Sequence, residues 1–137
     1  MRYLAIDHGT TRMGIAVSDE LKLIAQPLEF IPSQPADRFF ARLQEILSGK
    51  QVELILVGMP RNMDGTYGPA AQKVQEFIEA LRQFTSVPIK ALDERLTSVQ
   101  ANRALITGGV RRAERKQKVD AMAAAILLQS YLDARTA

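Results

Sequence analysis

Short apolar runs, each closed by turn-forming residues, occupy the first part of the chain. Residues 3–6 form one run, which ends at Asp7-His8-Gly9, and residues 13–17 form a second. This pattern predicts two strands. A third strand is expected over residues 21–31, where Pro27 favours an edge position or a bulge. Because the links between these strands are short, we expect antiparallel neighbours.

The period of the apolar residues changes after Pro35. Phe39, Phe40, Leu43, Ile46 and Leu47 share one helical face, which predicts a helix that Gly49 is placed to end. Residues 54–57 then predict a fourth strand, which ends at Gly58.

The second half of the chain alternates in the same way. An apolar stripe from Ala70 to Leu81 predicts a second helix, and residues 87–92 predict a fifth strand. Thr97-Ser98-Val99-Gln100 resembles a capping box that opens a short helix ending at Gly108. The last helix carries Val119, Met122, Ala123, Ile126 and Leu127 on one face.

This order of elements predicts an α/β fold in a single domain over residues 1–137. Strands 1, 4 and 5 are joined through helices and are therefore expected to be parallel, with right-handed crossovers. The five-stranded mixed sheet is expected to have the order 3-2-1-4-5, with helices on both faces.

Acidic residues follow the strands that are expected to be parallel. Asp7 ends strand 1, and Asp93-Glu94 ends strand 5. The carboxyl ends of parallel strands meet at one edge, where open α/β sheets bind their ligands. Asp120, which is expected to begin the last helix, could reach the same edge. The sequence therefore predicts a cluster of carboxylates.

Composition limits the chemistry of such a cluster. The chain has no Cys and one His, His8, so oxygen ligands and a hard cation such as Mg²⁺ or Mn²⁺ are indicated. Two such ions can activate water and stabilise the leaving oxygen of a phosphodiester. Asp7, on the central strand, is the favoured bridging ligand, and Gly9 would allow a sharp turn that keeps the site open.

Each acid also has an ordinary structural interpretation. Asp7-His8-Gly9 could be a strand-ending turn, Asp93 and Glu94 could form surface ion pairs, and Asp120 could cap the last helix. The prediction of a site depends on the three positions meeting in space.

Charge is unevenly distributed, although the net charge is only +3. Residues 103–118 include six basic residues and one acidic residue, Glu114. Such a segment can contact a nucleic-acid backbone, but it could also be a solvated loop. No apolar run is long enough to span a membrane, and the start of the chain is unlike a signal peptide, so a cytoplasmic protein without membrane contact is expected.

Several blocks of the sequence together resemble the YqgF family of Holliday-junction resolvases and pre-16S ribosomal RNA nucleases. The blocks are Ile6-Asp7-His8-Gly9, Arg12 to Asp19, Val57 to Pro60, Asn62 to Thr66, Asp93 to Ser98 and Lys118 to Leu127. They cover almost the whole chain in order. The resemblance implies an RNase H-like fold and metal-dependent cleavage of structured RNA or branched DNA by a monomer or a homodimer.

The resemblance also implies roles for individual residues. The motif acids map to Asp7, Glu94 and Asp120, which would be both catalytic residues and ligands of one or two ions. Asp93 is the alternative to Glu94, since strand alternation sends the two side chains to opposite faces. Related resolvases carry an acid at the end of strand 4, where this chain has Gly58-Met59-Pro60. The candidates for phosphate contacts are Arg61, Arg95, Arg111, Arg112, Arg115, Lys116 and Lys118.

Processing of the 5′ end of precursor 16S ribosomal RNA is the favoured function, on the resemblance alone, and Holliday-junction resolution is the alternative. Asp7 to Thr11 also resembles the first phosphate loop of actin-like and sugar kinases, but 137 residues leave no room for the second domain that those proteins need. A non-catalytic RNA-binding module is the remaining alternative.

Overall fold

The structure is a computed structural model that describes residues 1–60, 67–93 and 112–136, with side chains in the last range described for residues 121–135. Its elements are β1 (Arg2–Asp7), β2 (Arg12–Ser18), β3 (Ala25–Pro32), α1 (Ala36–Lys50), β4 (Val52–Met59), α2 (Pro69–Phe84), β5 (Ile89–Asp93) and α4 (Arg112–Thr136). The short helix predicted over 97–108 lies outside the described residues.

The five strands form one sheet in the order β3-β2-β1-β4-β5. Antiparallel pairing joins β1 to β2 and β2 to β3, whereas β1–β4 and β4–β5 are parallel. Helices α1 and α2 make the connections that the parallel strands require. The predicted strand order and strand directions are therefore confirmed.

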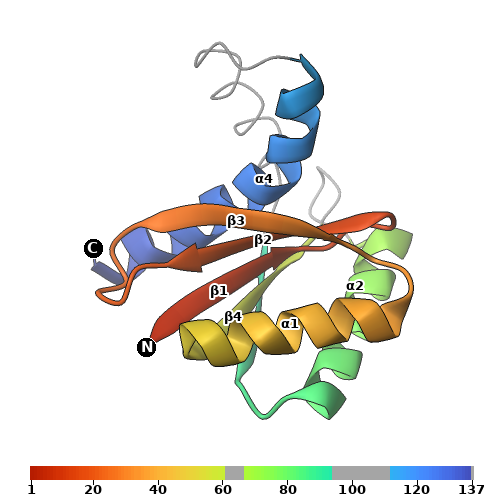
Figure 1. The fold of residues 1–137 in the computed structure, drawn as a ribbon, viewed down its shortest axis with the longest axis horizontal. Helices are drawn as coiled ribbons and strands as arrows, with labels where there is room; N and C mark the ends of the chain where they lie inside the picture. The colour runs from red at the N-terminus through yellow and green to blue at the C-terminus, as the bar shows by residue number, and fades with distance from the viewer. Residues whose placement is uncertain (61–66, 94–111, 137) are drawn as a thin grey trace.

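Helices cover both faces of this sheet, with α1 and α2 on one side and α4 on the other (Figure 1). Alternation along β1 divides its side chains between two cores. Leu4 and Ile6 pack with α1 and α2, while Tyr3 and Ala5 pack with α4. All four side chains are buried, as the apolar run at the start of the chain predicts.

The first helix ends one residue after the predicted stop. Phe39, Leu43, Ile46 and Leu47 are buried along one face of α1. Gly49 remains helical, and Gln51 takes the left-handed conformation (φ 52°) while its backbone N–H donates to the carbonyl of Leu47. The prediction that Gly49 ends the helix was wrong, because the cap forms at a residue that accepts a positive φ without being glycine.

The third strand begins later than predicted, because residues 21–24 form a loop. Asp19 Oδ1 accepts hydrogen bonds from the backbone N–H groups of Leu23 and Ile24, at 2.8 and 2.9 Å. An acid that satisfies two backbone donors favours a turn over continuation of the strand. Leu21, Leu23 and Ile24 are exposed in consequence.

The last helix also differs from the prediction, because it begins at Arg112. The basic residues after position 111 are therefore helical, in line with the helix-forming composition of Ala113 to Lys118. Asp120 lies well inside the helix, so its interpretation as an N-terminal cap was wrong. In the described ranges, no helix combines the length and the apolar content that a membrane crossing requires.

Hydrogen bonds fix the carboxyl-terminal half of α4 to the β2–β3 hairpin. Gln129 Oε1 accepts the backbone N–H of Ala25 at 2.8 Å, and Gln129 Nε2 donates to the carbonyl of Leu23 at 3.0 Å. One backbone group is at the first residue of the edge strand and the other is in the loop just before it, so one side chain sets the position of the helix along the sheet.

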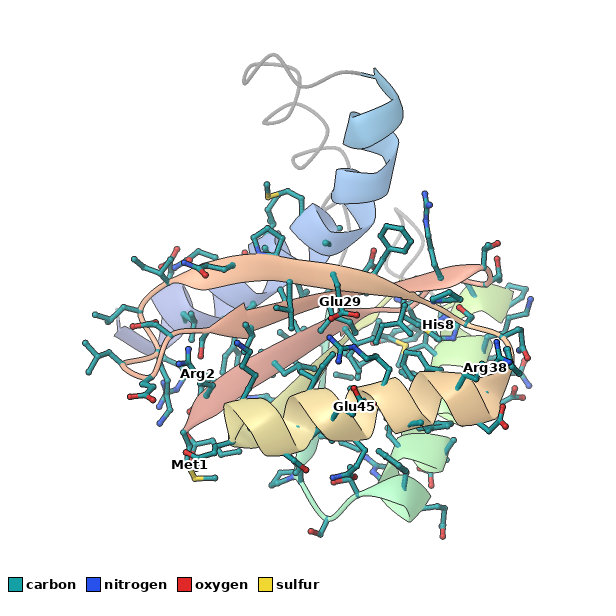
Figure 2. The ribbon with its side chains drawn as sticks, in the orientation of Figure 1. Met1, Arg2, His8, Glu29, Arg38 and Glu45 are labelled. Carbon is teal, nitrogen blue, oxygen red and sulfur yellow. The ribbon has the colours of Figure 1, made fainter. Side chains whose placement is uncertain are left out.

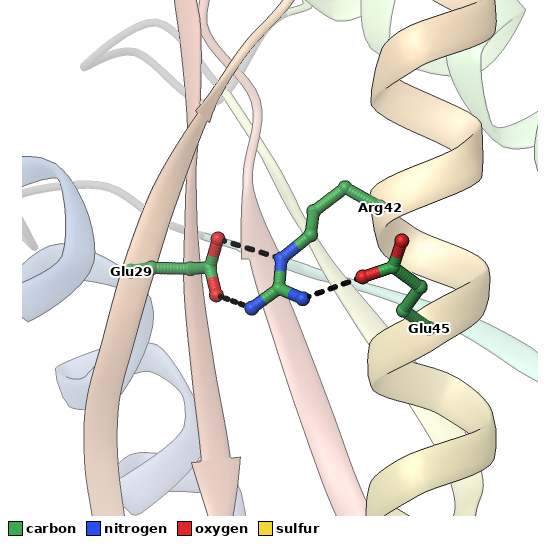
Figure 3. Close-up of polar contacts among 3 residues, drawn as sticks. All are labelled: Glu29, Arg42 and Glu45. Atoms are coloured by element: carbon green, nitrogen blue, oxygen red, sulfur yellow. Dashed lines mark hydrogen bonds and ion pairs between the residues drawn. The ribbon is translucent and has the colours of Figure 1, made fainter.

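An ion pair joins the edge strand β3 to helix α1, which lies on the face of the sheet opposite to α4 (Figure 3). Arg42 donates from Nε and Nη2 to both carboxylate oxygens of Glu29, and from Nη1 to Glu45 at 2.8 Å. The hydrogen bonds that Arg42 donates to Glu29, together with the one to Glu45, raise the pKa of Arg42. The group is largely exposed, so we expect it to orient the strand more than to stabilise the fold.

Small side chains allow α4 to pack close to the sheet. Ala5 and Ala16 are paired across β1 and β2, and they share a buried cluster with Ala124 and Ala125 of the helix. With one carbon in each side chain, the helix and sheet backbones approach closely. We predict that Ala124→Leu, at a fully buried position, lowers the free energy of unfolding by about 1–3 kcal/mol through overpacking.

Urea denaturation measures this effect, and Ala134→Leu serves as the control because Ala134 is exposed on the same helix. Equal unfolding free energies for the two variants would contradict the close packing.

Candidate active site at the carboxyl end of the central strand

Asp7 is the last residue of β1 and lies between two strands that carry glycine beside it. Its partner on β2 is Gly14. On β4, Ile6 pairs with Val57, so the parallel register brings Gly58 beside Asp7. The half-buried carboxylate therefore has no neighbouring side chain at either flanking position.

Strand alternation decides which face of the sheet Asp7 belongs to. It is in phase with Tyr3 and Ala5, which pack with α4. The next residue, His8, is on the other face, where its ring centroid lies 5.0 Å from that of Phe77 in α2. The candidate carboxylate is therefore on the face that α4 covers.

Asp93, the last residue of β5, is in the opposite phase. It pairs with Met59 of β4. Ile89, four positions before Asp93, packs against the core formed by α1 and α2. Leu92, one position before Asp93, packs against the core formed by α4. Asp93 is thus in phase with the face opposite to Asp7.

The loop after Asp7 is closed tightly, in agreement with the sharp turn predicted at Gly9. A Cβ atom at Gly9 would lie 2.2 Å from the carbonyl oxygen of Arg12. Ser33, after the end of β3, holds this loop from the side: its Oγ donates to the carbonyl of Gly9 at 2.8 Å, and its N–H donates to the carbonyl of Thr11 at 2.8 Å.

The role of Ser33 could not be predicted from the sequence. A serine between Pro32 and Gln34 carries no pattern that connects it with a glycine 24 residues earlier. Only the pairing of β2 with β3 brings the end of β3 next to the loop.

The structure describes only part of the predicted site. Glu94, Arg61, Arg95 and Arg111 lie outside the described residues, as do the side chains of Asp120, Arg112, Arg115, Lys116 and Lys118. Among the described side chains, no three potential metal ligands are clustered. Asp7 is therefore placed at the sheet edge as predicted, while its gathering with the other acids stays a prediction.

Comparison with known proteins gives a consistent result along the whole chain. A family profile described as "RuvX: Holliday junction resolvase" matches residues 1–134. A protein of Symbiobacterium thermophilum named "Putative pre-16S rRNA nuclease" is 47% identical over 137 residues, which cover 100% of this chain and 95% of that protein.

Solved structures share the fold. The RuvC of T. thermophilus in complex with a Holliday junction substrate has a TM-score of 0.60 at 25% identity, covering 99% of this chain and 96% of that chain. The Fowlpox virus resolvase in complex with Holliday junction DNA has a TM-score of 0.63 at 11% identity, with both chains fully covered. The RNase H-like fold is therefore confirmed.

The single histidine of the chain provides a test of the packing beside Asp7. Burial lowers the pKa of His8 below its ordinary value of 6.5, and the positive charge of Lys73 lowers it further. The folded protein then binds fewer protons than the unfolded chain as the pH falls through 6.5. We predict that the free energy of unfolding decreases over that interval.

Urea denaturation between about pH 7.5 and pH 5.5 measures the decrease, and ¹H NMR gives the pKa directly because one imidazole titrates. The variant His8→Gln should show a flatter dependence. A His8 pKa at or above 6.5 would contradict the burial of the ring.

Proposed function

This chain belongs to the RuvX family of Holliday junction resolvases, and from that premise we propose that it is a metal-dependent endonuclease whose catalytic carboxylates are Asp7, Glu94 and Asp120. The observation that carries the assignment is the place of Asp7. It ends the central strand, on the face that α4 covers, between two glycines.

Glycine on both flanks gives the site the space that a phosphodiester and its counter-ions need. Side chains at Gly14 and Gly58 would project from the sheet on the same face as Asp7, because residues directly opposite one another share a face. Gly58 occupies the strand end at which related resolvases carry an acid. This chain has no acid at that place, and we propose that the second acid follows the next strand along the sheet.

Strand alternation favours Glu94 over Asp93 as that second acid. Asp93 is in phase with the α1 and α2 face, away from Asp7. A residue one position further along an extended strand has the opposite phase. We therefore assign Glu94 to the face of Asp7 and give Asp93 no ligand role.

Helical periodicity supports Asp120 as the third acid. Ala124, Leu128 and Leu132 are buried against the sheet at intervals of four residues along α4. Position 120 continues this series toward the start of the helix. The close packing of α4 on the alanines of β1 and β2 then suits a short side chain such as aspartate.

The chemistry of these donors fits a hard divalent cation. All three are carboxylates, and oxygen ligands of this kind are the ones that Mg²⁺ and Mn²⁺ prefer. We infer that Asp7, Glu94 and Asp120 would hold Mg²⁺ or Mn²⁺. When bound, such ions supply activation of water and stabilisation of the leaving oxygen.

We propose structured RNA as the substrate, and specifically the 5′ end of precursor 16S ribosomal RNA. The relative from Symbiobacterium thermophilum, identical at 47% of positions, is named "Putative pre-16S rRNA nuclease", which supports precursor 16S ribosomal RNA as the substrate. The phosphate contacts are assigned to Arg61, Arg95 and the basic residues from Arg111 to Lys118. Branched DNA is the second candidate substrate, because the family is described as a Holliday junction resolvase and a structural neighbour was solved in complex with a Holliday junction.

Asp7→Asn tests the catalytic assignment. The amide keeps the size of the side chain but removes the charge that a cation needs, so cleavage should fall by at least about a hundredfold. Substrate binding and folding should be retained. The matched control is Asp37→Asn, at an exposed acid in the first turn of α1. A variant Asp7→Asn that cuts as fast as the parent would end the proposal.

The choice between neighbouring acids is tested by Glu94→Gln beside Asp93→Asn. Because the two side chains are expected on opposite faces, the first variant should lose cleavage and the second should keep most of it. Single-turnover rates with saturating Mn²⁺ measure both. The reverse result would assign the ligand to Asp93 and show that β5 does not continue as an extended strand.

The substrate is tested by single-turnover cleavage of two nucleic acids under the same conditions, with Mg²⁺ or Mn²⁺. One is a precursor 16S 5′ leader and the other is a four-way DNA junction. We expect the leader to be cut faster. Faster cleavage of the junction would favour resolution of branched DNA as the function.

A further inference from the structure

We propose that the cavity enclosed by residues 8–10, α1 and α2 binds one unpaired nucleobase of the substrate strand, on the face of the sheet opposite to Asp7. The inference rests on the proposed nuclease function, because it takes the occupant to be part of the same nucleic acid.

The cavity has a volume of about 470 Å³ and opens at the carboxyl end of β1. Its floor is formed by Met13 and Phe39, which are buried. The loop after Asp7 forms one wall, and Ser33, which lines the cavity, holds this loop in place through Gly9 and Thr11. The two hydrogen bonds of Ser33 therefore hold the loop in the conformation that forms this wall of the cavity.

Flat rings line the wall between the loop and the helices. Phe40 and Phe77 are close to parallel, with centroids 6.5 Å apart and planes at 23°, and His8 lies against Phe77. Figure 2 shows His8 between the strand ends and the helices of this face. Phe77 is buried behind its neighbours, so the half-buried rings of Phe40 and His8 are the ones that a base can reach, and aromatic rings stack with bases of any identity.

Polar groups at the rim suit the rest of a nucleotide. Lys73 and Glu76 of α2 both line the cavity and are exposed. Lys73 lines the same cavity as His8 and Phe77, so its charge lies at the rim near the aromatic side chains. Lys73 can pair with a phosphate, while Glu76 can accept a hydrogen bond from an exocyclic amino group of the base.

The position relative to Asp7 explains why the occupant would belong to the substrate. Asp7 and His8 are consecutive, so their Cα atoms are about 3.8 Å apart, and their side chains leave the strand on opposite faces. A strand that crosses this edge can present a phosphate to Asp7 and a neighbouring base to the cavity. Only an unpaired base can turn out in this way at little cost, which selects single-stranded segments of a structured RNA.

His8 is the only histidine and lines the cavity, so its imidazole NMR signals report occupancy. The full-length protein is titrated with adenosine 5′-monophosphate to about 20 mM in the presence of EDTA, since one stacked base and one phosphate contact support affinity near millimolar. We expect a saturable shift of the His8 signals. No shift, or a shift that does not saturate, would overturn the proposal.

Paired variants locate the binding. Phe40→Leu keeps an apolar side chain but removes the flat ring, and it should raise the Kd by about tenfold. Its control is Phe84→Leu, since Phe84 contacts Phe40 at 4.9 Å between centroids but does not line the cavity. Lys73→Gln should also weaken binding, whereas Lys50→Gln, at the exposed end of α1, should not. Equal Kd values within either pair would overturn the proposal.

A substrate arm separates this inference from the proposed function. Phe40→Leu and Lys73→Gln should raise the KM for a single-stranded oligoribonucleotide and leave kcat largely unchanged, and their two controls should change neither constant. Asp7→Asn should instead lose cleavage and leave the response of the His8 signals to the nucleotide intact. Cleavage without any KM difference between Phe40→Leu and Phe84→Leu would retain the nuclease and remove the base site.

Discussion

The close contact between α4 and the sheet is the constraint on which the rest of the molecule depends. Ala5 and Ala16 on the strands meet Ala124 and Ala125 on the helix, so the two backbones are separated by very little side-chain volume. Gln129 fixes the same helix lengthwise against the β2–β3 hairpin. The helix that carries Asp120 is thereby held in both distance and register, and a carboxylate on it can be placed without a long, flexible side chain.

Successive side chains at the end of β1 lie on opposite faces of the sheet, so the two faces carry different groups there. One side carries the partly buried Asp7 between glycines, and the other carries His8 against the phenylalanines of α1 and α2. The proposed carboxylate site and the proposed base site therefore lie on opposite faces of the same strand end. A polyanion that runs across the edge can contact both sides, which neither face could offer alone.

Much of this architecture could be predicted from the sequence, because it follows from local patterns. The apolar runs and the lengths of the links between them predicted the strand order, and the glycine after Asp7 predicted the tight turn. The start of β3 could not be predicted, since the hydrogen bonds from the backbone to Asp19 compete with strand pairing. The hydrogen bond from Ser33 to the carbonyl of Gly9 could not be predicted either, because it joins segments 24 residues apart.

The separation of 2.2 Å between an added Cβ at position 9 and the carbonyl oxygen of Arg12 limits how this protein can vary. Any amino acid other than glycine would have to displace the backbone at the start of β2, and with it the strand that lies beside Asp7. Substitutions at position 9 are therefore expected to be tolerated poorly, in evolution and in laboratory randomisation alike. Thr10 and Thr11, whose side chains are exposed, leave the neighbouring positions open to both.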